Sequence, residues 1–161
     1  MLSVTMSQIA EEAGIGRATL YKYFPDVKAI LVAWHERQIG AHLVRLVDAR
    51  DRADGALARL DSVLRVYALI LHEIRRHGGS DLASFLHGDT HLVRPEAELH
   101  ALVADLIEHA AASGEVRSDV GAEELARYCL RALGAARDAR SNAAVDRLVS
   151  ITLTGLRPAT D

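Results

Sequence analysis

Apolar residues recur at intervals of three and four along most of this chain, and this spacing places them on one face of an α-helix. Similar stripes occupy 99–110, 125–136 and 145–156. The longest stripe is made of Leu57, Leu60, Leu64, Tyr67, Leu71 and Ile74. The pattern predicts an all-α fold built from several amphipathic helices.

Two short helices are predicted near the N-terminus. Thr5 followed by Gln8 has the capping-box pattern that starts a helix, and Gly14 is the residue type that best ends one. A second helix is expected over 17–24. It ends before Pro25, because the residue that precedes a proline is pushed out of the α region.

A long third helix is expected to begin after Asp26 and to continue to about Val47. Its predicted buried residues are Ile30, Leu31 and Trp34, and for Trp34 a core position is favoured over a place in a ligand cavity. The polar residues 50–55 predict a loop between this helix and the next.

The second half of the chain is divided by glycines and a proline. A break is predicted at 77–80, then a short helix over 81–87 and an irregular stretch to Arg94, with Pro95 starting the next helix and Gly114 ending it. Two closing helices follow at about 121–139 and 143–156. The small residues 134–136 favour a close helix–helix contact, either in the core or between subunits.

Composition narrows the possible functions. Half of the 161 residues are apolar and a quarter are charged, as in a folded domain. The net charge of −3 excludes an overall basic surface, so any contact with nucleic acid must be local. Cys129, the one cysteine, forms no internal disulfide. No apolar run approaches a membrane span, the first residues lack a signal-peptide pattern, and we expect a cytoplasmic protein.

Residues 6–23 have the spacing of a helix-turn-helix. Ala10 is small where the two helices would cross, Gly14 permits the turn, and Ile9, Ile15 and Leu20 are expected to fill the wedge between the helices. The second helix of such a unit enters the major groove of DNA. From Gly16 to Pro25 this chain has two cations and no carboxylate, whereas Glu11 and Glu12 would have to point away from the duplex.

The stretch from Thr5 through Ile9-Ala10 and Gly14 to Thr19-Leu20-Tyr21 and Tyr23-Phe24 resembles the signature of the TetR (tetracycline repressor) family. A weaker resemblance covers 113–119 and 123–126, which are similar to the linker that enters the family's dimerisation helices. The resemblance implies a DNA-binding domain over 1–48 and a ligand-binding and dimerisation domain over 49–161. Family members carry another helix before the equivalent of Thr5, so the resemblance implies that this first helix is missing here.

The resemblance also implies individual roles. Leu20 and Phe24 match core positions, while Lys28 stands one place after the position at which the family usually has a lysine. The residues predicted to contact DNA are Thr5, Arg17, Ala18, Thr19, Tyr21, Lys22, Tyr23 and Lys28. A ligand pocket is implied among the helices from Ala56 to Tyr128, with candidate residues Tyr67, Leu71, Phe85, His87, His91, Leu102 and Leu106.

Eight histidines raise the question of a metal site, with His87, Asp89 and His91 close in sequence and His72 and His77 on a neighbouring segment. Because neither cysteine-rich nor His-Glu-x-x-His spacing is present, solvated or pocket-lining histidines are favoured over metal ligands. We expect no cofactor and no catalytic residue.

The predicted function is that of a ligand-responsive repressor that binds a duplex DNA operator as a homodimer and is released by a small molecule. The dimer is expected to form through 121–139 and 143–156. Two alternatives from other classes remain open at this point: a helical dimer that binds a small molecule or a partner protein without DNA, and a histidine-dependent metallohydrolase.

Overall fold

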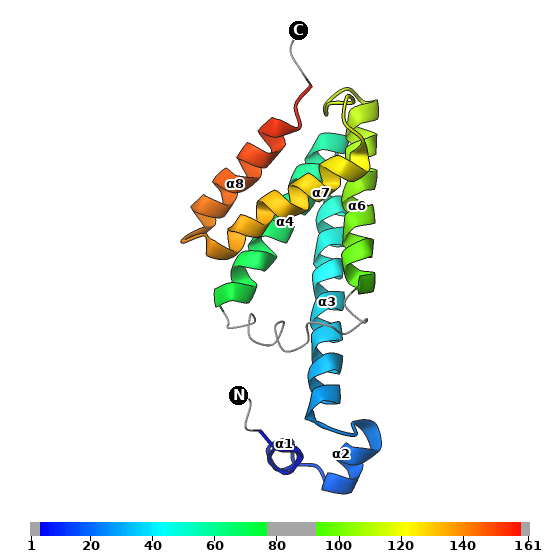
Figure 1. Ribbon diagram of the computed structural model, residues 1–161, viewed down its shortest axis with the longest axis vertical. Coiled ribbons are helices and arrows are strands. Elements are labelled where there is room, and N and C mark those ends of the chain that lie inside the picture. Colours follow the sequence, from blue (N-terminus) through cyan, green and yellow to red (C-terminus); the bar gives the residue numbers. More distant parts are fainter. Residues whose placement is uncertain (1–3, 77–92, 159–161) are drawn as a thin grey trace. The chain divides into compact units, whose positions relative to one another are not determined.

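The computed structural model describes residues 4–76 and 93–158, and every regular element within those ranges is helical (Figure 1). The predicted all-α fold is confirmed. The chain divides into two compact units, Met1–Gly40 and Ala41–Asp161. The division falls inside α3 (Val27–Arg52), as does the boundary at residue 48 expected from the sequence.

The first unit contains α1 (Met6–Glu12), α2 (Arg17–Tyr23) and the first part of α3. Asp26 caps α3, since its Oδ1 accepts a hydrogen bond from the Ala29 backbone N–H at 2.8 Å. The predicted buried face of α3 is only partly present. Ile30 and Leu31 are half-buried, but the Trp34 side chain is 49% exposed, so the core position predicted for it is wrong. The buried cluster of this unit reaches along α3 only as far as Ile30.

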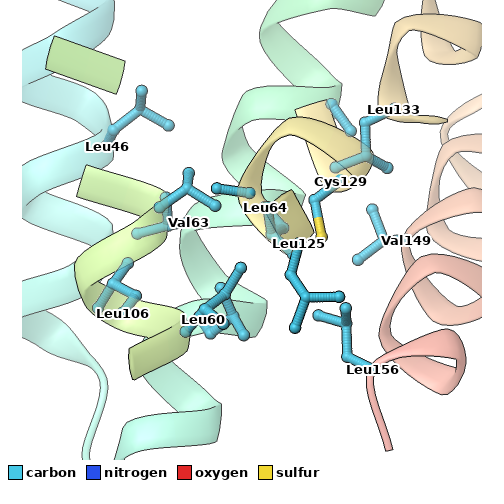
Figure 2. Packing of buried hydrophobic residues seen from close by; sticks show 14 of the residues in the cluster. Leu46, Leu60, Val63, Leu64, Leu106, Leu125, Cys129, Leu133, Val149 and Leu156 are labelled. Atoms are coloured by element: carbon cyan, nitrogen blue, oxygen red, sulfur yellow. The ribbon is translucent and has the colours of Figure 1, made fainter. Parts of the chain in front are cut away.

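The second unit contains α4 (Ala56–Arg76), α6 (Val93–Ala112), α7 (Ala122–Leu133), the 3₁₀ segment η2 (Gly134–Asp138) and α8 (Asn142–Gly155). Each helix turns its apolar stripe into one shared core, and α6, α7, η2 and α8 all pack against α4. Figure 2 shows this packing around Leu60, Leu64, Leu125 and Leu133.

Two boundaries differ from the prediction by a few residues. Residues 50–52 belong to α3 and not to a loop, because Arg50 and Arg52 pair with Asp51 and Asp48 and place positive charge at the helix C-terminus. Pro95 does not start α6, which begins at Val93. A proline is tolerated in the first turn of a helix, where its missing N–H has no intrahelical acceptor.

The first closing helix is shorter than expected. The α-helix ends at Leu133, and residues 134–138 continue as the 3₁₀ segment η2. The small side chain of Ala136 is fully buried, and Arg75 of α4 donates a hydrogen bond to Asp138 at 2.7 Å. Of the small residues 134–136, Ala136 thus makes its close contact in the core of this unit, whereas Ala135 is exposed.

Candidate nucleic-acid interface

A tight turn joins α1 to α2. At the start of α1 the Thr5 hydroxyl oxygen accepts a hydrogen bond from the Gln8 backbone N–H, and Gln8 Oε1 accepts one from the Thr5 N–H. At its end Gly14 adopts a φ of 68°, and the Ile15 N–H donates to the Ala10 carbonyl at 3.0 Å. The predicted capping box and the stop at Gly14 are confirmed.

A small buried cluster of Met6, Ala10 and Leu20 holds the two helices together, and Leu20 is only 5% exposed. Ile9 and Phe24 pack against this cluster and are partly buried. The roles predicted for Ala10 and Leu20 are confirmed. The core role predicted for Ile15 is wrong: this side chain is 42% exposed, because the residue lies in the turn and outside both helices.

Met6 was missed as a core residue. Its spacing of three and four to Ile9 and Ala10 is the helical signal that could have identified it.

The rest of α2 is exposed. With Leu20 directed into the cluster, the residues left on the surface of this helix are Arg17, Ala18, Thr19, Tyr21, Lys22 and Tyr23. Tyr21 and Tyr23 are 53% and 68% exposed. The Lys22 ammonium lies 6.0 Å from the centre of the Tyr23 ring, at the outer limit of a cation–π contact. Six of the eight residues predicted to contact DNA are thus on one short helix and exposed.

The remaining two predicted contacts lie outside α2. The Thr5 hydroxyl also donates a hydrogen bond to Gln8 Oε1 at 3.0 Å. This hydrogen bond must break before the hydroxyl can donate to a phosphate. Lys28 is exposed in the first turn of α3.

The acidic residues of α1 bear on the local charge. Glu11 and Glu12 are both exposed. Glu12 lines a shallow groove of about 520 Å³ together with Val4, Gln8 and Ile9, and no residue of α2 lines this groove. Glu12 therefore contributes to a groove that α1 and its flanking residues form without α2.

The second unit holds a pocket of about 530 Å³ between α4, α6, α7 and η2. Of the residues nominated for ligand binding, Tyr67 lines this pocket, Leu71 and Leu106 are buried in the core, and Leu102 packs against it. Phe85, His87 and His91 lie outside the described residues. Burial raises the pKa of the Tyr67 hydroxyl, which therefore remains a hydrogen-bond donor at neutral pH.

Among the described residues, no group of three or more histidine, cysteine, aspartate or glutamate side chains is arranged to hold a metal ion. The segment with His87, Asp89 and His91 is not among them. His72 of α4 is buried, and its Nδ1 has no hydrogen-bond partner. A buried nitrogen without a partner costs stability.

Two large apolar side chains are exposed on the last helices. Tyr128 of α7 is 49% exposed and Ile151 of α8 is 66% exposed. Tyr128 was expected on the buried stripe of α7. Its hydroxyl instead lies beside Gly155 of α8, where a Cβ added to the glycine would be 3.4 Å away. The last two helices therefore each expose one large apolar side chain. No helix in the described part of the chain is long and apolar enough to cross a membrane.

Two family models match this chain, and both describe regulatory proteins. A family model described as the C-terminal domain of SbtR-like transcriptional regulators matches residues 69–158, and one described as bacterial regulatory proteins of the tetR family matches residues 1–33. A search among curated proteins gives no match.

Several solved structures share the fold. A TetR/AcrR-family regulator from Thermobifida fusca YX-ER1 aligns with a TM-score of 0.79 at 17% identity, covering 96% of this chain and 88% of that one. The ketosteroid regulator KstR2 of Mycobacterium tuberculosis aligns with a TM-score of 0.71 at 17% identity, covering 96% and 85%. FadR from Bacillus subtilis, solved with stearoyl-CoA, aligns with a TM-score of 0.68 at 14% identity, covering 96% and 89%.

Proposed function

We propose, from the premise that this chain belongs to the TetR family of transcriptional regulators, that it binds duplex DNA through α2 and is released when a small molecule binds the second unit. The observation that carries the proposal is the exposed side of α2. Arg17, Tyr21, Lys22 and Tyr23 are all exposed on this helix, which Leu20 holds against α1. Arginine and lysine supply phosphate contacts, and arginine also reads guanine in the major groove.

Different side chains of α2 would supply affinity and sequence specificity. Lys22 is a flexible point charge beside Tyr23 and suits a phosphate, which all sequences share. Arg17 and Thr19 lie near the N-terminal end of the helix, which is the part that reaches base edges in a helix-turn-helix. We therefore assign affinity mainly to Lys22 and sequence discrimination mainly to Arg17 and Thr19.

A homodimer would place two copies of α2 on one duplex. Half-sites must be about one helical turn apart, roughly 34–36 Å, or a related distance after bending. The exposed Tyr128 and Ile151 support dimerisation through α7 and α8, because exposed apolar patches commonly mark interfaces. A regulator of this kind acts where the DNA is, so we also propose a cytoplasmic location.

The small-molecule part of the proposal is supported by the pocket beside Tyr67. It is also supported by two proteins of the same fold, one named a ketosteroid regulator and one solved with stearoyl-CoA. A ligand releases DNA only if it binds the DNA-incompetent state more tightly than the competent one. Repression relieved by the ligand is the outcome we expect.

The test measures DNA affinity against salt concentration. Fluorescence anisotropy with a labelled random-sequence duplex gives the slope of log K against log [salt], which counts the phosphates neutralised. Lys22→Ala should weaken binding uniformly across sequences and reduce the slope by about one. Arg140→Ala is the matched control, since Arg140 is exposed in the second unit and is not among the predicted DNA contacts.

The result discriminates between the proposal and its alternative. An unchanged slope in Lys22→Ala would remove the phosphate role. If the parent chain binds no duplex at any salt concentration, the alternative gains support, namely a helical dimer that binds a small molecule or a partner protein without DNA.

A further inference from the structure

The pocket of the second unit is lined by three arginines, Arg127 and Arg131 of α7 and Arg137 of η2. We infer that it binds a small organic anion that has an apolar body, and that such an anion is the effector. The part of this inference that concerns DNA release rests on the proposed function, whereas the binding of the anion does not.

Charge is the first argument. The lining contains one carboxylate, that of Glu96, so the three guanidinium groups leave a formal surplus of positive charge in a chain whose net charge is −3. Other arginines of this unit, such as Arg75 and Arg117, are paired with carboxylates at 2.7 and 2.6 Å.

Within the described residues, the three pocket arginines have no such partner. Guanidinium groups bind carboxylate and phosphate through paired, parallel hydrogen bonds. The pocket therefore presents three solvent-exposed guanidinium groups to an anionic ligand.

The apolar side of the lining is the second argument. Tyr67, Leu99 and Leu130 are half-buried and lie among residues that pack against the core. The Tyr67 hydroxyl is protonated at neutral pH, and its partial burial raises its pKa further, so this group donates a hydrogen bond to an anion and does not repel it. An aliphatic or aromatic body would cover these side chains while its charged end reaches the arginines.

The size of the pocket limits the ligand. A volume of about 530 Å³ lies within the range of small-molecule sites, which is roughly 300–1,000 Å³. The lining thus suits a compact amphiphile, with a carboxylate, phosphate or sulfonate as its charged group.

The experiment uses two fluorescent probes with the same kind of body. Anilinonaphthalene sulfonate carries the charge, and N-phenyl-1-naphthylamine lacks it. The full chain should bind the sulfonate more tightly, and Arg131→Gln or Arg127→Gln should weaken that binding about fivefold to tenfold each. The affinity for the neutral probe should stay the same in both variants.

Glu96→Gln should change the affinity for the sulfonate probe in the opposite direction. Removal of the one carboxylate in the lining should strengthen binding of the sulfonate about twofold to threefold, which a general loss of structure would not do. Arg140→Gln is the matched control, since it is exposed, follows η2 and does not line the pocket. Circular dichroism and melting temperature verify that each variant is folded.

Competition for the probe site then separates the contribution of charge from that of hydrophobicity. Octanoate and octyl phosphate should displace the sulfonate probe and 1-octanol should not, and the ratio of the two anions identifies the preferred headgroup. The inference is overturned if octanol competes as well as octanoate, or if the arginine variants bind the sulfonate probe as the parent does.

The last step connects the pocket to DNA. Saturating octanoate should weaken duplex binding by the parent but not by Arg131→Gln, and both proteins should bind DNA equally without it. If octanoate fills the pocket and DNA affinity does not change, the effector role is refuted. If no DNA binding is seen at all, the proposed function fails, while the probe measurements still decide whether the pocket is an anion site.

Discussion

The turn between α1 and α2 depends on one backbone conformation, and this makes it a sharp test. Gly14 has a φ of 68°, in the left-handed region, and a Cβ added there would meet no heavy atom within 4 Å. Gly14→Ala therefore adds backbone strain without a clash. The left-handed conformation costs an L-residue about 1–2 kcal/mol, so the free energy of unfolding of the first unit should fall by about that amount.

Two other glycines provide matched controls. Gly114 has a φ of 76° and open space around it, so Gly114→Ala should cost a similar amount in the second unit. Gly40 lies within α3 and outside the left-handed region, and an added Cβ would meet nothing within 4 Å. Gly40→Ala should therefore raise the free energy of unfolding by about 0.5–1 kcal/mol.

Amide hydrogen exchange locates each effect. In Gly14→Ala the amides of residues 6–24 should exchange about 5-fold to 30-fold faster, while those of α4 and α6 keep the rates of the parent. In Gly114→Ala the accelerated amides should lie in the second unit. Gly14→Asn should be milder than Gly14→Ala, because asparagine visits the left-handed region more readily. Unchanged or slower exchange in Gly14→Ala would refute the claim that this turn requires glycine.

Further predictions concern the buried clusters of the two units. Leu20→Ala should destabilise the first unit by about 2–4 kcal/mol because Leu20 is buried. Ile15→Ser, at an exposed position, should change stability by less than about 0.5 kcal/mol, and urea titration followed by tyrosine fluorescence measures both. Ile107→Ala, at a fully buried site in the second unit, should cost about 2–5 kcal/mol in calorimetry. Cys129 is fully buried, and burial raises its pKa to about 12, so a thiol reagent at pH 8 should modify it only as fast as the protein unfolds; rapid modification of the native protein would contradict the packing.

Much of the first unit could be predicted from the sequence, because its elements are set by local chemistry. The capping box at Thr5, the stop at Gly14 and the cap at Asp26 each require only residues within three positions. The inward position of Leu20 follows from helical periodicity. Ile15 was misplaced because its exposure depends on the path of the chain through the turn, which periodicity does not describe.

The second unit shows where sequence reasoning stops. The apolar stripes predicted the helices, but Tyr128 lies at the edge of one stripe, and the neighbouring helix α8 leaves it half exposed. The pocket was harder to predict. Arg127, Arg131 and Arg137 look like ordinary solvated charges in sequence, and only the packing of α7 and η2 against α4 and α6 brings them to one cavity with Tyr67. Such a site depends on contacts between distant segments, for which a single sequence carries no signal.

The two units share α3, which offers one route by which the two candidate sites can influence each other. Val27 and Ile30 of this helix pack in the first unit's cluster, while Leu46 is buried in the core of the second. An effector that changes how Leu46 packs would therefore bias the orientation of α3, which directly follows α2 in the chain. Because coupling is reciprocal, DNA must then weaken anion binding by the same factor by which the anion weakens DNA binding. Equal factors in the two titrations would support a single coupled equilibrium, and a factor of one in either would show that the pocket and α2 act independently.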